Sequence, residues 1–109
     1  MADQPVEAYY SAIDEGRYDD LRGLLAPEFV HDRPDRTIDG PDTFVGFMRD
    51  DRPLTDTRHT LEAVCANEDD SEFAVRGTLL DADGDPLFGF VDVHTVEDGT
   101  IARIETYTN

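Results

Sequence analysis

The chain has 109 residues, the size of one ordinary domain, so residues 1–109 are expected to form a single folded unit. Its formal net charge is −17, from 26 acidic and 9 basic residues. Such a surface repels nucleic acid and anionic membranes, and we expect neither as a partner. The hydrophobic residues, 39% of the chain, lie in periodic runs, which argues against disorder and favours a folded protein adapted to high salt.

The cysteine content and the first residues of the chain indicate the cellular compartment in which the protein is expected. Cys65 is the only cysteine, so no disulfide can form within the chain, which is typical of a reducing compartment. The start, Met1 to Pro5, has no basic region followed by an apolar segment. No apolar run approaches the ~20 residues that a membrane span needs. We therefore expect a cytoplasmic protein.

The first half of the chain predicts helices. A first helix lies between a candidate cap at Asp3 and Gly16, a residue that suits a helix end. Its apolar residues recur at the spacing of one helical face: Val6, Tyr9, Tyr10 and Ile13. A second, short helix carries three leucines, Leu21, Leu24 and Leu25, and is expected to stop at Pro27.

A short strand over 29–32 follows, and a third helix is predicted from Gly40-Pro41-Asp42 to a point before Pro53. The second half predicts strands over 59–66, 72–80, 87–96 and 100–108. Asp83-Gly84 and Asp98-Gly99 are hairpin signals between them. Helices followed by an antiparallel meander predict an α+β fold with the helices packed on one face of a curved sheet.

The strand over 87–96 has two apolar faces. Alternation places Phe88, Phe90, Asp92, His94 and Val96 on one face, and Leu87, Gly89, Val91, Val93 and Thr95 on the other. The helices cover one of these faces. We expect a second copy of the chain to cover the other, giving a homodimer through the outer face of the sheet.

Asp92 is the candidate for chemistry that follows from the residues alone. It lies between two valines in the most apolar stretch of the chain, where an unpaired carboxylate is costly. Burial raises the pKa of such a group, so Asp92 could donate a hydrogen bond to a ligand oxygen or act as an acid or base. A structural carboxylate bonded to Tyr, Arg or backbone donors is the alternative. His94, on the same face, is either its acid–base partner or a pocket-rim residue.

Four segments in this order, 9–21, 25–29, 38–42 and 93–101, resemble the nuclear transport factor 2-like superfamily. That group includes ketosteroid isomerase, scytalone dehydratase and the SnoaL-type polyketide cyclases. The resemblance covers nearly the whole chain. It implies a cone-shaped curved antiparallel sheet with three N-terminal helices packed on its concave face. The same fold hosts many unrelated functions, so it does not fix an activity.

The resemblance also implies site residues. In ketosteroid isomerase, a Tyr on the first helix and a protonated Asp on a late strand form an oxyanion hole. Tyr9 and Asp92 match these two positions, and Tyr10 takes the place of Tyr9 if the helix face is rotated. The family's base is expected just before the Pro that follows the first strand, where this chain has Arg33 with Asp32 one residue earlier.

The segment before Pro34 is expected at the mouth of the pocket. Alternation turns either His31 with Arg33 inward, or Asp32 inward. His94, Asp32 or His31 would then be the second proton carrier beside Asp92. The apolar pocket walls are expected to be Phe73, Val75, Phe88, Phe90 and Ile104.

One apparent metal pattern is rejected. Asp81, Asp83, Asp85 and Asp92 fall at EF-hand positions, but the glycine that the loop needs at its sixth position is Pro86. A hairpin turn with surface acids explains the pattern better, and we expect neither a metal nor a cofactor. Arg76, inside an apolar strand, is expected to pair with an acidic neighbour across the sheet.

The leading hypothesis is a pocket that binds a hydrophobic, oxygen-bearing small molecule. If the protein is an enzyme, the expected reaction is proton transfer next to a carbonyl: isomerisation, cyclisation or dehydration. The alternative is a non-catalytic module for dimerisation or protein binding, whose cavity is filled by its own aromatic side chains. An open cavity beside Asp92 distinguishes the first hypothesis from the second.

Overall fold

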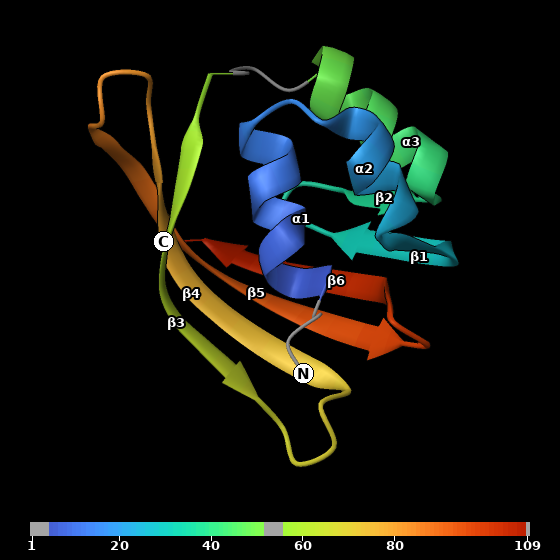
Figure 1. The fold of residues 1–109 in the computed structure, drawn as a ribbon. Coiled ribbons are helices and arrows are strands. Elements are labelled where there is room, and N and C mark those ends of the chain that lie inside the picture. Colours follow the sequence, from blue (N-terminus) through green and yellow to red (C-terminus); the bar gives the residue numbers. More distant parts are fainter. Residues whose placement is uncertain (1–4, 52–55, 109) are drawn as a thin grey trace.

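A curved sheet of six strands holds the helices on its concave side (Figure 1). The computed structural model describes residues 5–51 and 56–108, so the expectations that rest on Asp3 and Pro53 lie outside these ranges. The elements, in chain order, are α1 (Pro5–Asp14), α2 (Tyr18–Gly23), β1 (Leu25–Asp32), β2 (Thr37–Asp39), α3 (Pro41–Gly46), η1 (Phe47–Asp51), β3 (Arg58–Ala66), β4 (Glu72–Leu80), β5 (Pro86–Glu97) and β6 (Thr100–Thr108).

The predicted antiparallel meander is confirmed in β3 to β6, each of which pairs with the next. Strand β1 adds to β6 in parallel and carries β2 on its other side, so the sheet is mixed and its order is β2-β1-β6-β5-β4-β3. The tight turn between β5 and β6 has positive φ at both Asp98 (53°) and Gly99 (79°), as its Asp-Gly sequence predicts. The α+β fold class is confirmed.

The segment from Leu25 to Pro27 was predicted as the end of a helix, and this prediction is wrong. Leu25 already belongs to β1 and pairs with Ile101 of β6. The β1–β6 register shifts between Leu25 and Val30, which places Pro27 in an irregular stretch where its missing N–H breaks no regular ladder. The short strand β2 was not predicted, and the third helix continues beyond α3 as the π-helical turn η1.

Helix α1 presents the buried face that its spacing predicts, with both Tyr9 and Tyr10 only 3% exposed. It ends at Asp14, two residues before Gly16, whose φ of 69° favours glycine, and Arg17 N–H donates to the Ala12 carbonyl at 2.8 Å. The two tyrosines extend from the helix toward the concave face of the sheet, where they meet residues of β5. This contact positions the site described below.

Gly77 of β4 allows an unusually close approach between strands. A Cβ added there would lie 2.3 Å from the carbonyl oxygen of Thr60 and 2.8 Å from Cζ of Phe90. The Phe90 ring therefore lies directly over the backbone of β4, and it is 6% exposed. A larger residue at position 77 would move either β3 or this ring, which forms part of the cavity wall.

The outer face of the sheet carries a row of paired residues, Ala63, Arg76, Val91 and Tyr107, one from each of four strands. Val91 is 36% exposed and Tyr107 58%. The Arg76 guanidinium lies 3.5 Å from the Glu62 carboxylate on β3, which confirms that this arginine pairs with an acidic neighbour across the sheet. Among the described residues, no helix has the length and apolar character that crossing a membrane requires.

Candidate functional site

A cavity of about 660 Å³ lies between the helices and the concave face of the sheet. Residues from helix, strand and loop meet in its wall, and those that matter below are Tyr9, His31, Arg33, His59, Phe88, Phe90, Asp92 and Thr106. Apolar side chains contribute most of the surface, and one of the polar ones, Thr106, is hydrogen-bonded to Asp92. The cavity is open beside the residue that the sequence singled out.

Asp92 lies in the middle of β5, on the inner face, and is 6% exposed. Its Oδ1 accepts a hydrogen bond from Thr106 Oγ1 at 2.6 Å, since Thr106 is its direct partner on β6. Its Oδ2 accepts a hydrogen bond from the Tyr10 hydroxyl at 2.7 Å. Burial raises the pKa of Asp92 above its ordinary value, although these two donated bonds and the nearby His59 and Arg33 act in the opposite direction.

Two histidines extend this network. His94 Nε2 lies 2.8 Å from the Tyr10 hydroxyl, and His31 Nε2 lies 2.7 Å from Thr106 Oγ1. Each hydroxyl has one hydrogen and gives it to Asp92, so each histidine must donate its Nε2–H to the hydroxyl. The result is two short chains of hydrogen bonds that converge on Asp92, one from His94 through Tyr10 and one from His31 through Thr106.

Both histidines are neutral in this arrangement. Burial lowers the pKa of His94 to about 3, and burial together with the charge of Arg33 lowers that of His31 to about 3. Their Nδ1 atoms are buried and have no hydrogen-bond partner in the structure. A proton added at either Nδ1 would therefore be both charged and unpaired, which explains the direction of the shifts. Burial and Asp92 also raise the pKa of Tyr10, which keeps the phenol a donor.

This geometry determines what Asp92 can do. Each of its oxygens already accepts a hydrogen bond from a protein hydroxyl, so a proton bound to Asp92 is not needed for either of these bonds and can be given to a ligand in the cavity that Asp92 lines. A protonated carboxyl held in this way donates a hydrogen bond to an oxygen atom of a ligand. After losing that proton, the carboxylate remains stabilised by Tyr10 and Thr106.

The structure shows which of the candidate residues contact Asp92. Tyr9 lines the cavity, but the phenol bonded to Asp92 is that of Tyr10, the alternative that a rotated helix face left open. His94 is fully buried, and its ring packs edge-on against both tyrosines. Of the two alternatives for His94, the pocket rim is excluded because the residue is 0% exposed, and direct contact with Asp92 is absent because Tyr10 lies between them.

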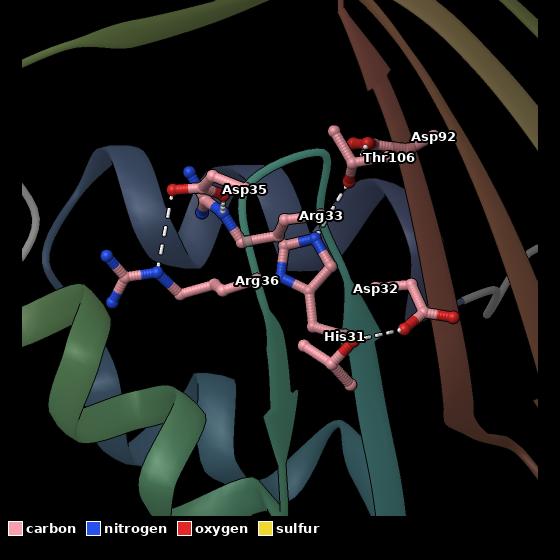
Figure 2. Close-up of polar contacts among 8 residues, drawn as sticks. His31, Asp32, Arg33, Asp35, Arg36, Asp92 and Thr106 are labelled. Carbon is pink, nitrogen blue, oxygen red and sulfur yellow. Dashed lines mark hydrogen bonds and ion pairs between the residues drawn. The ribbon is translucent and has the colours of Figure 1, made fainter.

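The strand alternation at the cavity mouth turns His31 and Arg33 inward. Figure 2 shows the His31 ring directed toward Thr106 and Asp92, and the Asp32 carboxylate directed away from them. Asp32 instead accepts a hydrogen bond from Thr37 at 2.8 Å and pairs with Arg103. The hypothesis that Asp32 faces the pocket is therefore wrong, since neighbouring strand residues point to opposite faces.

Arg33 lines the cavity where the resemblance places a base. Its guanidinium bonds Asp35 at 3.3 Å and lies 5.1 Å from the centroid of the Phe47 ring, which also contacts Arg36. A guanidinium stays protonated and cannot accept a proton from a ligand. Arg33 thus supplies positive charge at the mouth of the cavity, and the base must come from another residue.

The predicted pocket walls are correct in part. Phe90 and Phe88 line the cavity, and Leu87, predicted on the outer face, joins them because the β4–β5 register shifts between Leu79 and Leu80. Three other predicted wall residues belong to the closed core instead, with exposures of 0–2%: Phe73, Val75 and Ile104. Phe73 and Ile104 flank His94 in the sheet, where the helices cover the inner face.

The sequence interpretation missed three polar residues, namely the cavity residues His59 and Thr106, and Asp14, which contacts His59. His59 Nδ1 lies 2.7 Å from Asp14 Oδ1, and its backbone N–H donates to Asp14 Oδ2 at 3.0 Å. His59 pairs with the cavity residue Leu79, so strand alternation could have indicated its inward direction. Thr106 could have been found in the same way, but the contact from Asp14 could not, because it depends on how α1 crosses the sheet.

The acidic hairpin between β4 and β5 brings ligand atoms of Asp81, Asp83 and Asp85 within 4.8 Å of one another. Asp81 Oδ1 accepts the backbone N–H groups of both Asp83 and Asp85, at 2.9 and 3.0 Å. These bonds are those of a turn, and Asp92 faces the cavity rather than this hairpin. The turn explains the spacing of these acids without a metal.

Residues 6–104 match the model of a protein family described as the SnoaL-like domain. Similar folds occur in a proposed polyketide cyclase from Sinorhizobium meliloti, which is 19% identical with a TM-score of 0.81 over 94% of this chain and 93% of that chain. A proposed ketosteroid isomerase from Kribbella flavida is 20% identical, with a TM-score of 0.84 over 96% and 75% of the two chains.

An epoxide hydrolase from M. tuberculosis, described as LEH-like, is 20% identical, with a TM-score of 0.80 over 96% of this chain and 80% of that one. At these identities the similarity concerns the fold alone. No curated protein matches the sequence.

Proposed function

This chain belongs to the SnoaL-like domain family, and from that premise we propose that its cavity binds a hydrophobic small molecule through an oxygen atom hydrogen-bonded to Asp92. The observation that carries the proposal is the position of Asp92: a buried carboxyl on the cavity wall whose two oxygens both accept hydrogen bonds from the protein. The apolar part of the wall, which includes Phe88, Phe90 and Leu87, provides the apolar surface that such a ligand needs.

The reaction that this arrangement favours is proton transfer next to a carbonyl, as in an isomerisation, cyclisation or dehydration. A carbonyl oxygen gains negative charge when a neighbouring carbon loses a proton, and a protonated Asp92 stabilises that charge. Similar folds occur in proteins named for cyclase, isomerase and epoxide hydrolase activities, which supports a small molecule as the ligand. The groups required are side chains of this protein, so the proposal invokes no cofactor.

A non-catalytic interaction module is the alternative. It requires that the space beside Asp92 be filled by the protein's own aromatic side chains. A cavity of about 660 Å³ is within the usual range for ligand sites, and this favours the binding function.

We further propose that the protein is a cytoplasmic homodimer formed through the outer face of the sheet. Val91 and Tyr107 are adjacent on that face and more exposed than large apolar residues usually are in a covered sheet. The lone Cys65 is consistent with a reducing compartment. Light scattering in high salt should give the mass of two chains, and the mass of one chain would reject the dimer.

The proposed function is tested with β-tetralone, a hydrophobic ketone whose protons next to the carbonyl exchange slowly with deuterium oxide. The protein should bind it in the cavity and accelerate this exchange, which proton NMR measures directly. Asp92→Asn should weaken binding about tenfold, the equivalent of one hydrogen bond. It should slow the catalysed exchange by at least about a hundredfold, the usual contribution of an acid or base.

Asp32→Asn is the matched control, because Asp32 carries the same functional group on the opposite face of β1. This variant should bind β-tetralone and catalyse exchange as the unmodified protein does. Equal binding and exchange in the Asp92→Asn variant and the control would reject the role of Asp92.

A further inference from the structure

The network around Asp92 contains a proton donor, but proton transfer next to a carbonyl also needs a base. The residues first considered for this role are unsuitable. His94 and His31 are buried, and their Nε2 atoms are engaged with Tyr10 and Thr106. Asp32 faces away from the cavity and Arg33 cannot accept a proton. The base must therefore be a different residue in the cavity wall.

We infer that His59 removes the proton from the ligand and that Asp14 positions it, an inference that rests on the proposed function of the same cavity. His59 lines the cavity together with Asp92 and Phe90. Its side chain is 16% exposed, whereas His31 and His94 are closed off as whole residues, at 3% and 0%. His31 also lines the cavity, but its Nε2 is engaged with Thr106, so His59 is the histidine whose Nε2 is available to a ligand.

Asp14 holds His59 at two points. One carboxylate oxygen accepts the backbone N–H of His59 at 3.0 Å, and the other lies 2.7 Å from Nδ1. A carboxylate is an acceptor only, so Nδ1 carries a hydrogen, and in the neutral ring Nε2 then carries the lone pair. This is the tautomer in which Nε2 can act as a base, and it is the reverse of the tautomer that His31 and His94 adopt.

The rest of the His59 surroundings fix the direction of the ring. Its centroid is 5.1 Å from that of Tyr10 and 5.6 Å from that of Phe90, which it meets nearly edge-on. His59 lines the cavity, and because Nδ1 is bonded to Asp14, Nε2 is the ring nitrogen that remains for a ligand there. In the part of the chain that the structure describes, no hydrogen bond involves Nε2, so this atom is left for a ligand.

The position of Asp14 is unfavourable for the helix that carries it. It is the last residue of α1, whose last turn has no basic residue, and a carboxylate there opposes the helix dipole. Both of its oxygens are directed to His59, and its side chain is 18% exposed. An acid in this place is explained by the imidazole it orients rather than by stabilisation of the helix.

The proposed step is balanced within the cavity. His59 Nε2 takes a proton from the carbon next to the ligand carbonyl, and the electrons of that C–H bond form a carbon–carbon double bond. The carbonyl π electrons move to oxygen, which accepts the proton or a hydrogen bond from Asp92. The Asp14 carboxylate stabilises the imidazolium that forms. Return of the proton from His59 to carbon completes an isomerisation, or exchange with deuterium when the solvent is deuterium oxide.

The test uses the full chain and β-tetralone. His59→Gln keeps an amide donor for Asp14 but has no base, and it should slow the catalysed exchange by at least about a hundredfold while binding changes less than about threefold. Asp14→Asn should slow exchange by a smaller factor. Asp19→Asn, at an exposed acid of α2, is the matched control and should have no effect.

Chemical rescue separates a catalytic role from a structural one. Added imidazole should restore exchange in the His59→Ala variant, and it should restore nothing in Asp92→Asn. Undiminished exchange in His59→Gln would overturn the inference while leaving the proposed function intact. Absence of binding and exchange in the unmodified protein would instead reject the proposed function.

Nitrogen NMR tests the inference without turnover. In the free protein, His59 should carry its hydrogen on Nδ1, and its Nε2 resonance should shift when β-tetralone binds. In the Asp14→Asn variant, the hydrogen of His59 should no longer prefer Nδ1 over Nε2. Finding the hydrogen of His59 on Nε2 in the unmodified protein would overturn the assignment whatever the exchange rates are.

Discussion

Asp92 shows how a buried carboxyl is accommodated on the wall of a cavity. Two hydroxyls donate to it, and behind each hydroxyl lies a neutral histidine that donates in turn. Hydrogen bonds arranged in series polarise one another, so His94 and His31 strengthen the bonds that Tyr10 and Thr106 give to Asp92. The histidines thus act on Asp92 through Tyr10 and Thr106, and we infer that they support Asp92 rather than carry protons.

The neutrality of His94 predicts a specific pH dependence of stability. Its pKa is about 3 in the folded protein against an ordinary value of 6.5, so between these values the unfolded chain binds a proton that the folded protein does not. The unfolding free energy then falls as the pH falls through this window, by up to about 1.4 kcal/mol per pH unit for this residue.

Urea titrations of the unmodified protein and of His94→Gln measure this effect. The glutamine does not titrate, so the variant should lose less stability per pH unit between about pH 6 and pH 4, whatever its starting stability. Titration of the many surface carboxylates is common to both proteins and cancels in the comparison. Parallel pH profiles would show that His94 is protonated in the folded state and would contradict the hydrogen-bond directions assigned to Tyr10.

At the level of elements, the sequence predicted best where one periodicity determined the structure. The four long strands alternate clearly, and their hairpins have the residues that tight turns need, so β3 to β6 were predicted almost to their ends. Near Leu25 the apolar residues fit helical spacing as well as a strand, and only pairing with β6 decides between them. The strand β2 is too short for any pattern to indicate it.

The residues of the site were also predicted only in part, because local patterns do not determine how distant elements meet. Asp92 stands out in any reading of its strand, but Tyr9 and Tyr10 are adjacent on one helix and both are buried. Their roles depend on a small rotation of α1 over the sheet, which no local pattern specifies. The pair of Asp14 and His59 joins residues 45 apart in the sequence, and only the tertiary structure brings them together.

Gly77 provides a prediction at this level, because it fixes the distance between β3, β4 and the ring of Phe90. Gly77→Ala should cost roughly 1–3 kcal/mol of unfolding free energy, since the added methyl meets the backbone of Thr60 and the ring together. Displacement of Phe90 should also weaken binding of β-tetralone. Urea unfolding and a binding titration measure the two effects.

Gly46→Ala is the matched control, because a Cβ at Gly46 would meet no atom within 4 Å. This change lies in a helix and should be neutral or stabilising by up to about 1 kcal/mol. Equal effects of the two substitutions would show that the close approach at Gly77 does not constrain the sheet.

For the whole molecule, the dominant feature is a net charge of −17 on 109 residues. The ion pairs of the surface, such as Arg17 with Asp20 and Arg22 with Asp42, are exposed and contribute little each. They cannot offset the mutual repulsion of the remaining carboxylates, which salt screens. We infer that the folded state is most stable in concentrated salt.

The corresponding prediction is that the urea midpoint rises as potassium chloride increases from about 0.1 M, where the Debye length is about 10 Å, to about 1 M, where it is about 3 Å. The steepest part of the rise should come in the lower half of this range, since screening of surface charges is nearly complete near 1 M. A midpoint independent of salt would show that the surface charge does not limit stability.

The central claim is that the cavity beside Asp92 is a binding site for an oxygen-bearing hydrophobic molecule, and a crystal structure with β-tetralone tests it most directly. The account predicts the ketone within the cavity, its oxygen within hydrogen-bond distance of Asp92 and the carbon next to its carbonyl facing His59 Nε2. A cavity closed by the protein's own side chains, or a ketone bound with its oxygen away from Asp92, would contradict it.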